Sequence, residues 1–386
     1  MSLETKGMNP ENDYILPDAD HKLAREDHKH DHVDVTGPSE HPTVIILGGQ
    51  PGSGKSAMLR QAMNAFPTGE RPVRVDVDIL RESHPAYDEL KLVDDRTAAG
   101  LVQSDSAKWG DELVEDARKA RRNIIIDGTL KSPEKAEALC RQFKAEDYRT
   151  EIWAMAVSKE DSDLGVYGRY EAAKADGGHG RWVPEKVRDE AYSHLPISLK
   201  LLNQSDAVDK IQVHGRLMGD GTKTRKLYDQ APGKSDPVAV LKAERSRQRE
   251  PQEQEWFETE TRKVRVEIEK RDPNLSEPEN RDFVERIHSL EQEKRKPKTA
   301  GQPSSSPKTM SEKSSQEVPN TNVEWQTQTR SGKQSTKSGW TSEKSNVNFQ
   351  AEADAVNEQN NAKSKSVAER WRPSEQKSLD RERTRD

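Results

Sequence analysis

The chain has 386 residues, of which 30% are hydrophobic and 34% are charged, with a formal net charge of −6. Because so few apolar residues cannot bury a core along the whole chain, we expect one folded domain with polar flanks. The nearly balanced charge differs from that of a basic nucleic-acid-binding protein, so no nucleic-acid partner is expected. No apolar run is long enough to span a membrane, so no membrane association is expected either.

Residues 1–40 are polar, and we expect them to form a disordered N-terminal tail. A metal site is the alternative interpretation, but the segment lacks the apolar residues that would fix a coordination geometry. It also lacks the apolar run of a signal peptide, which favours the bacterial cytoplasm and leaves secretion without a cleaved signal open. Histidines gather in and beside this segment: His21, His28, His30, His32 and His41.

The folded domain is expected over residues 41–232, where apolar runs alternate with helical patterns. Strands are predicted at Thr43–Leu47, Val73–Val77, Asn123–Asp127, Glu151–Val157 and Lys210–His214. Helices are predicted at Ser56–Phe66, Ala98–Ala120, Pro133–Phe143, Asp161–Ala175 and Pro184–His194. This alternation is typical of an α/β fold, a three-layer sandwich with a mainly parallel sheet of five or six strands. Ligands of such sheets bind where the parallel strands end.

The segment Gly49–Ser56 matches the phosphate-binding pattern G-x-x-x-x-G-K-[ST] and lies between a predicted strand and a predicted helix. Its glycines let N–H groups point at phosphate oxygens, and the helix adds its N-terminal dipole. Lys55 is expected to bridge the β- and γ-phosphates of ATP, and the Ser56 hydroxyl to bind Mg²⁺. The predicted ATP-binding residues are Gly49, Gln50, Pro51, Gly52, Ser53, Gly54, Lys55, Ser56 and Ala57.

Acidic side chains end the second and third predicted strands, namely Asp76, Asp78 and Asp127. A carboxylate beside a phosphate-binding loop serves the metal, its water or the acceptor hydroxyl, although acids also cap turns at strand ends. Asp76 lies deeper along its strand than Asp78, which favours a structural role for Asp76.

Two arginines follow the fourth strand. Arg169 lies on the next predicted helix, and Arg181 comes directly after Gly177–Gly180. Since kinases use arginines to stabilise the charge of the transferred phosphoryl group, both are candidate catalytic residues. The glycines before Arg181 indicate a lid that closes over ATP.

Beyond residue 232 the periodic pattern weakens. Residues 233–295 predict a charged, partly helical linker, and residues 296–386 predict a disordered low-complexity tail. An interaction protein in which this tail is the working part is therefore one alternative, although a mere nucleotide switch would not need a catalytic base.

Together these segments resemble the zeta toxin family of bacterial toxin–antitoxin systems, over about residues 41–232. The resemblance implies a P-loop kinase that uses ATP and Mg²⁺ to phosphorylate the 3′-hydroxyl of UDP-N-acetylglucosamine, which blocks peptidoglycan synthesis, and it implies an antitoxin partner. The carrying segments are GGQPGSGKS at 48–56, VDVDILRESHPAYDEL at 75–90, IIIDGTLKSP at 124–133, IWAMAVSKEDSDLGVYGRYE at 152–171, GRWVPEKVRDEAYSHLP at 180–196 and KIQVHGR at 210–216.

By position, the resemblance makes Asp78 the catalytic base, with Lys55, Arg169 and Arg181 as the other catalytic residues. It places the substrate against Asp78, Asp111, Asp127, Thr129 and Lys131. The family usually has glutamates in place of Asp111 and Asp127, and often an arginine in place of Lys131. Since these differences change the reach to sugar hydroxyls and phosphates, a kinase of another small hydroxyl compound, such as an antibiotic or nucleoside, stays an alternative.

Overall fold

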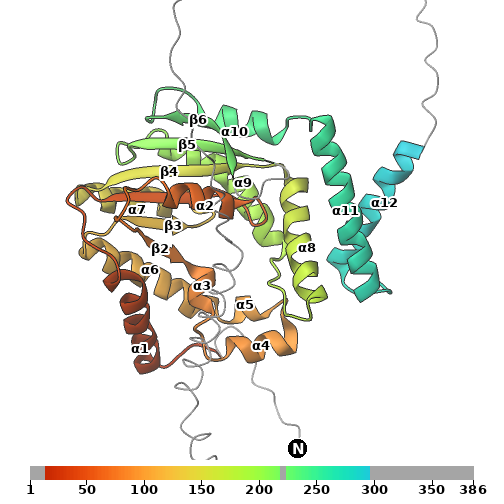
Figure 1. Cartoon of the computed structure of the whole chain (residues 1–386), viewed down its shortest axis with the longest axis horizontal. Helices are drawn as coiled ribbons and strands as arrows, with labels where there is room; N and C mark the ends of the chain where they lie inside the picture. Colours follow the sequence, from red (N-terminus) through yellow and green to blue (C-terminus); the bar gives the residue numbers. More distant parts are fainter. Residues whose placement is uncertain (1–13, 218–222, 296–386) are drawn as a thin grey trace, which may run out of the picture. The chain divides into compact units, whose positions relative to one another are not determined.

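A six-stranded sheet in the order β2-β3-β1-β4-β5-β6 forms the centre of the computed structural model, which describes residues 14–217 and 223–295, with side chains through residue 288 (Figure 1). Strands β1 to β5 are parallel, and β6 runs antiparallel to β5. The α/β fold with a mainly parallel sheet is therefore confirmed. The strands are β1 (Thr43–Gly48), β2 (Val73–Asp76), β3 (Ile124–Asp127), β4 (Arg149–Ala156), β5 (Lys210–Arg216) and β6 (Thr224–Gln230).

The unbroken apolar run of β1 follows from burial on both faces of the sheet. Val44 and Ile46 pack in one cluster with side chains of α6 (Gln103–Lys119) and α7 (Pro133–Ala145). Ile45 and Leu47 face the other way, into a cluster with α2 (Lys55–Met63). The phosphate-binding loop follows the carboxyl end of β1. Because β1 lies in the middle of the sheet, the carboxyl ends of β3 and β4 lie on the two sides of this loop, where ligands of such sheets bind.

Two helices differ most from the sequence prediction. The helix expected over Ala98–Ala120 is broken at Val102, which is buried, giving α5 (Ala98–Leu101) before α6. The helix α9 (Glu185–Leu202) does not end near His194 but runs through Pro196. The remaining helices of the domain are α3 (Val77–Arg81), α4 (Tyr87–Asp94) and α8 (Lys159–Ala175). No helix in the described part of the chain is long and apolar enough to cross a bilayer.

The disordered tail expected for residues 1–40 is wrong for residues 14–40; residues 1–13 lie outside the described ones. The helix α1 (Asp18–Lys29) packs along α6, beside which it lies in Figure 1. His21 and His28 are buried against Trp109, with ring centroids 5.3 and 5.2 Å apart respectively. The buried face of α1 is thus built largely from histidine, which an apolar pattern does not reveal.

His21 lies between two carboxylates of α6. Its Nδ1 is 2.7 Å from Asp105 Oδ1, and its Nε2 is 3.1 Å from Glu112 Oε2. Within the described residues no cluster of three or more His, Cys, Asp or Glu side chains could hold a metal ion. His21 and His28 pack α1 against α6, and His21 adds hydrogen bonds to Asp105 and Glu112.

Residues 233–288 are partly helical, as predicted, but they are packed against the domain rather than forming a linker. The helices are α10 (Pro237–Arg245), α11 (Pro251–Arg271) and α12 (Pro278–Arg295). Val264 and Phe283 join a second core with Tyr167 of α8, whose ring centroid is 4.1 Å from that of Phe283. Residues 296–386, expected to be disordered, lie outside the described residues.

Candidate functional site

The phosphate-binding loop connects β1 to α2 and is closed by glycines in left-handed conformations. Gly52 and Gly54 have φ of 79° and 90°, which side chains other than that of glycine rarely adopt. A Cβ atom on Gly52 would lie 2.0 Å from the carbonyl oxygen of Ser162, at the start of α8. The loop is therefore pressed against α8, and only glycine fits at this contact.

Lys55 opens α2 and lies among charges from several elements. Its Nζ donates a hydrogen bond to the Gly49 carbonyl oxygen at 2.9 Å. Burial lowers the pKa of Lys55, the carboxylate of Asp127 opposes this shift, and the charges of Arg181 and Arg169 add to it. The structure thus brings Lys55, Arg169, Arg181 and Asp127 within electrostatic range of one another, although they come from four separate segments.

The loop fits a nucleoside triphosphate. The Ser53 hydroxyl is buried and has no hydrogen-bond partner among the described residues, so its capacity to donate to a phosphate oxygen is unused. Ser56 is exposed in the first turn of α2, where a hydroxyl can reach a metal ion that also binds phosphates. Mg²⁺ commonly has few protein ligands and completes its coordination with phosphates and water, which suits a single hydroxyl.

Asp76 caps the helix that carries Asp78. Its Oδ1 accepts a hydrogen bond from the Asp78 backbone N–H at 3.0 Å, at the N-terminus of α3. Its Oδ2 accepts from Arg74 at 2.5 Å. Asp76 therefore has the structural role expected from its place in the strand. By capping α3, it fixes where the helix that carries Asp78 begins.

The Asp78 carboxylate is held by two arginines. Its Oδ1 accepts from Arg81 Nη1 at 2.8 Å, and its Oδ2 is ion-paired with Arg181 Nη1. Arg81 is buried and also donates to Gln103 Oε1 at 2.6 Å, so α6 helps to fix its orientation. The Asp78 side chain is still 42% exposed, which leaves it accessible to a ligand.

Sequence analysis missed Arg81 and Gln103. Arg81 comes three residues after Asp78 on α3, and this helical spacing was the one available signal. Gln103 is distant in sequence and was not detectable in this way. Arg81 donates a hydrogen bond to Asp78, and Gln103 accepts one from Arg81, so both are positioning residues, Gln103 indirectly.

The segment before Arg181 is anchored and is not the free hinge that its glycines indicate. The Gly180 N–H donates to Asp95 Oδ2 at 3.0 Å, and Trp182 is buried beside the Tyr170 ring. A Cβ atom on Gly180 would lie 2.5 Å from that ring, so this glycine is needed for close packing. Burial lowers the pKa of Arg181 to about 10, and Asp76 partly opposes the shift.

A cavity of about 580 Å³ lies at the ends of β2 and β3, between α6 and α7. Asp111 of α6 and Asp127 of β3 both line it, so the structure brings together two of the predicted substrate residues. Burial raises the pKa of Asp127, whereas the nearby Lys55 lowers it. Asp127 therefore connects this cavity to the phosphate-binding loop. The other lining residues are Val75, Val77, Gly110, Val114, Glu115, Arg118, Ile126, Lys135, Ala138, Leu139 and Gln142.

Asp78, Thr129 and Lys131 are not among the residues that line this cavity, although Val77, the neighbour of Asp78, is. The Lys131 Nζ atom is instead 3.6 Å from Glu190 Oε2 of α9. Both side chains of this pair are exposed. Lys131 therefore pairs with α9 and does not line the cavity that Asp111 and Asp127 share.

Gln50 of the phosphate-binding loop is bound from both sides. Its Nε2 donates to the Val157 carbonyl oxygen at 2.9 Å, and its Oε1 accepts from Arg245 Nη2 at 3.2 Å. Arg245 ends α10 and stacks on the Tyr192 ring, with its guanidinium carbon 3.9 Å from the centroid. No sequence pattern indicated that a residue beyond 232 reaches the loop.

Comparison with known proteins gives consistent matches. The family model for zeta toxin matches residues 26–232. The toxin zeta of Streptococcus agalactiae is 32% identical over 178 residues, which cover 46% of this chain and 61% of that protein. The toxin PezT of Streptococcus pneumoniae is 27% identical over 179 residues, covering 46% and 70%. The chain therefore matches less than two thirds of the length of the Streptococcus agalactiae relative.

A solved structure from the PezAT chromosomal toxin–antitoxin system of Streptococcus pneumoniae has the same fold. Its TM-score is 0.57 at 21% identity, and the superposition covers 68% of this chain and all of that one. At this identity the likeness concerns the fold alone.

Proposed function

Because this chain belongs to the zeta toxin family, we propose that it is an ATP-dependent kinase that phosphorylates the 3′-hydroxyl of UDP-N-acetylglucosamine and so blocks peptidoglycan synthesis. One observation supports this most directly. Asp78, accessible to a ligand, is ion-paired with Arg181, whose charge in turn acts on Lys55 of the phosphate-binding loop. A carboxylate that can accept a proton, an arginine and a phosphate-binding lysine therefore lie in one connected group of charges, as phosphoryl transfer to a hydroxyl requires.

The chain's residues divide the work as follows. Bound ATP with Mg²⁺ supplies the phosphoryl group and neutralises part of its charge. Lys55 and the loop N–H groups hold the phosphates, and Ser56 would hold the metal. Asp78 accepts the proton of the acceptor hydroxyl and orients its oxygen. Arg169 and Arg181 stabilise the charge that spreads over the transferred group.

The pairing of Asp78 with two arginines explains how one carboxylate can be both accessible and fixed. Arg81 is buried and holds one oxygen through a bond that a ligand need not disturb. Arg181 holds the other oxygen and is only partly buried, with 31% of its side chain exposed. When Arg181 turns toward phosphate, the second oxygen of Asp78 becomes free for the acceptor hydroxyl.

The acceptor would occupy the cavity between α6 and α7. Its volume of about 580 Å³ lies in the range of small-molecule sites. Asp111 and Asp127 provide hydrogen-bond acceptors for sugar hydroxyls, and Arg118 and Lys135 provide cations for a diphosphate. Arg118 is ion-paired with Glu146, so Lys135 has the more available charge of the two.

A kinase of another hydroxyl compound is the second candidate, and a specific observation favours it. Lys131 is paired with Glu190 instead of lining the cavity, and Val75, Val77 and Leu139 make part of the lining apolar. An acceptor with less charge and more apolar surface than a nucleotide sugar would suit such a lining.

The experiment is a phosphotransfer assay on the purified protein. Incubation with ATP, Mg²⁺ and UDP-N-acetylglucosamine should give a product heavier by one phosphate, with the new ester at the 3′-oxygen by NMR. Lys55→Ala and Asp78→Asn proteins serve as inactive controls. If the nucleotide sugar is untouched while a nucleoside or aminoglycoside in a parallel panel is phosphorylated, the acceptor is wrong and the kinase activity stands.

We further propose that an antitoxin protein inhibits this chain in the bacterial cytoplasm. The supporting comparison is the PezAT toxin–antitoxin system, to which the structurally similar chain belongs. Expression of the chain in bacteria should arrest growth, and expression of the Asp78→Asn variant should not. Growth arrest by both proteins alike would show that toxicity does not depend on phosphotransfer.

A further inference from the structure

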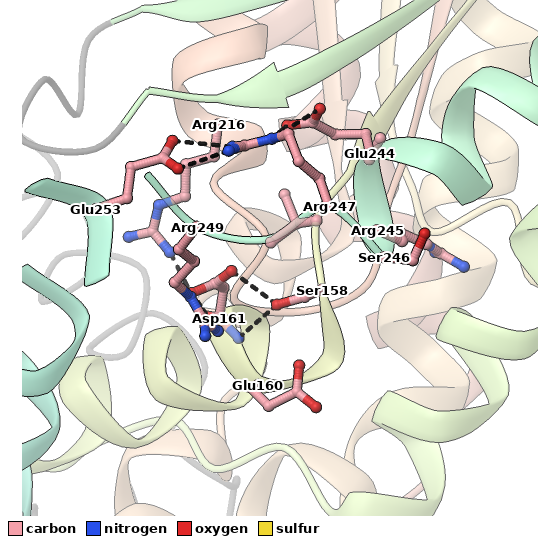
Figure 2. Close-up of a pocket in the computed structure, with 12 residues that line it drawn as sticks. Ser158, Glu160, Asp161, Arg216, Glu244, Arg245, Ser246, Arg247, Arg249 and Glu253 are labelled. Atoms are coloured by element: carbon pink, nitrogen blue, oxygen red, sulfur yellow. Dashed lines mark hydrogen bonds and ion pairs between the residues drawn. The ribbon is translucent and has the colours of Figure 1, made fainter. Parts of the chain in front are cut away.

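A second cavity, of about 390 Å³, lies on the other flank of the phosphate-binding loop (Figure 2). It opens where β4 and β5 end, and half of its wall comes from the region beyond residue 232, which the zeta toxin model does not match. The lining residues are Ala156, Val157, Ser158, Glu160, Asp161, Arg216, Glu244, Arg245, Ser246, Arg247, Arg249 and Glu253.

Strand order determines which end of a bound nucleotide this cavity can receive. The acceptor cavity lies at β2 and β3, the loop follows β1, and the second cavity lies at β4 and β5. If the γ-phosphate faces Asp78 and the acceptor, the rest of the nucleotide must extend away from them. The flank away from the acceptor is the one that carries the second cavity.

The charges of this cavity are mostly neutralised among themselves. Figure 2 shows Arg247 between Glu244 and Glu253, to which it is ion-paired at 3.3 and 2.7 Å. Arg249 pairs with Asp161 at 3.0 Å. These pairs build the wall and leave little net charge for attracting a ligand.

Arg216 differs from these arginines. Among the described residues it forms no ion pair, the carboxylate of Asp161 acts on its charge only from a longer distance, and its Nη1 donates a long bond, 3.4 Å, to the Asp161 carbonyl oxygen. Its Cδ lies 3.8 Å from where a Cβ on Gly54 would be, so it is adjacent to the phosphate-binding loop. Its guanidinium carbon is 5.2 Å from the ring centroid of Trp256 in α11.

A planar guanidinium supported on one side by an aromatic ring is suited to stack on a second planar group. The flat group nearest to a loop-bound triphosphate is the base of the same nucleotide. We propose that the cavity binds the nucleoside half of the triphosphate. Arg216 stacks against the base, and Trp256 positions Arg216. The C-terminal helices α10 and α11 are thereby part of the nucleotide site.

This inference rests on the proposed use of a nucleoside triphosphate, and it extends to the loop itself. Arg245 of α10 holds Gln50 of the loop, and Arg216 reaches Gly54 at the loop's other end. The helices beyond residue 232 therefore contact both the loop and the nucleoside cavity. A linker that is separate from the domain would make neither contact. The cavity volume of about 390 Å³ is ample for a base and a ribose.

The test compares ATP with inorganic tripolyphosphate, which has the phosphates but no nucleoside. Calorimetry on the full chain should show that Arg216→Ala raises the Kd of ATP about tenfold more than it raises that of tripolyphosphate, as loss of one stacking contact predicts. Trp256→Ala should act in the same direction more weakly, and Trp256→Phe should restore ATP affinity. Arg262→Ala, an exposed arginine of α11 that does not line the cavity, is the matched control.

Equal weakening of both ligands by Arg216→Ala would overturn the inference, because Arg216 would then contact phosphate only. Unchanged ATP binding in that variant would overturn it as well. If Arg216→Ala protein does not fold, Arg216→Lys keeps the charge without the planar group, and it should still lower the preference for ATP over tripolyphosphate. A wild-type protein that binds ATP but phosphorylates no acceptor would contradict the proposed function and leave this inference standing; a wild-type protein that binds neither ligand would contradict both.

Discussion

The phosphate-binding loop and the acceptor side of the site are built in different ways. The loop is one continuous stretch, and its shape depends on glycine backbone conformations at Gly52 and Gly54. The acceptor side is assembled from separate elements, with Asp78 on α3, Arg181 after α8 and Asp127 at the end of β3. A backbone-made site is specified locally, whereas a side-chain-made site depends on the whole domain being folded.

The two regions are also coupled through the charges of Lys55 and Asp127. Lys55 loses basicity through burial, and carboxylates on its acceptor side partly restore it. Asp127 has a pKa raised by burial and lowered by Lys55, so each group supports the charged form of the other. A substitution of either residue should therefore change the pKa of the other, and mutations can measure the size of this coupling.

The largest effect is expected from Lys55→Ala, which removes the cation of the loop. Phosphotransfer should fall roughly 10³-fold, because the charge on the transferred group loses its nearest fixed partner. Rate measurements with ATP at saturating acceptor would show this. Lys186→Ala, an exposed lysine of α9, is the matched control and should keep wild-type turnover. Wild-type turnover in Lys55→Ala would contradict the assignment of the loop.

The next largest effect is expected from Asp78→Asn, which tests the acceptor side alone. The substitution is nearly isosteric but cannot accept the proton, so kcat should fall roughly 10²-fold or more while the Kd of ATP stays the same. The comparison is made with Asp282→Asn, an exposed position of α12. If ATP binding weakened as much as turnover, Asp78 would belong to the loop's electrostatics and the two regions would not be separable.

The same contrast explains what the sequence could and could not reveal. The strands and the loop were predictable because apolar runs such as Thr43–Leu47 and the glycine pattern are local signals. The antiparallel β6 and the helices beyond residue 236 have mixed polar sequences, and their burial depends on partners such as Tyr167 that are distant in the chain. Arg245, which holds Gln50, is of this second kind.

The N-terminal helix shows another physical limit of sequence patterns. Histidine counts as polar in a periodicity, yet His21 and His28 form the buried face of α1 against Trp109. For the acceptor side, the family resemblance grouped Asp111 with Asp127, and both line one cavity, whereas no local pattern in the sequence links α6 to the end of β3. The resemblance also grouped Lys131 with them, but its side chain is ion-paired with Glu190 and does not line that cavity.

A smaller effect is expected from acid, through His28. Burial lowers the pKa of His28 from 6.5 to about 4, and the nearby charges of His32 and His21 add to this. The folded state therefore binds the proton less readily than the unfolded state, so the stability that His28 contributes is complete above pH 6.5 and is lost as pH falls toward 4. At pH 5 the loss should be about 2 kcal/mol of unfolding free energy.

Denaturant titrations from pH 7 to pH 4.5 would measure this slope. Because the Nε2 atom of His28 is buried and has no hydrogen-bond partner in the described part of the chain, His28→Leu should fold at pH 7 and have a shallower pH slope. His214, whose pKa burial also lowers to about 4, and His84, whose pKa burial also lowers, would contribute to the slope that remains. Since α1 packs on α6 and not on α2, hydrogen exchange at pH 5 should rise in α6 before it rises in α2. An identical slope in His28→Leu would exclude His28 as the titrating group.

The smallest effect is expected from Lys131→Ala, and its smallness is informative. Lys131 forms an exposed ion pair with Glu190 at 3.6 Å, and such pairs contribute little to stability. Because Lys131 does not line the acceptor cavity, its removal should lower kcat/KM less than about threefold, the equivalent of roughly 0.6 kcal/mol.

Asp111→Ala, which does change the lining, should raise the KM of the acceptor about tenfold, as the loss of a charged hydrogen bond predicts. Steady-state kinetics with the acceptor varied at saturating ATP would compare the two variants. A larger loss in Lys131→Ala than in Asp111→Ala would mean that the segment after β3 turns inward when the acceptor binds. The acceptor side would then be completed by its ligand, whereas the phosphate-binding loop is already formed without one.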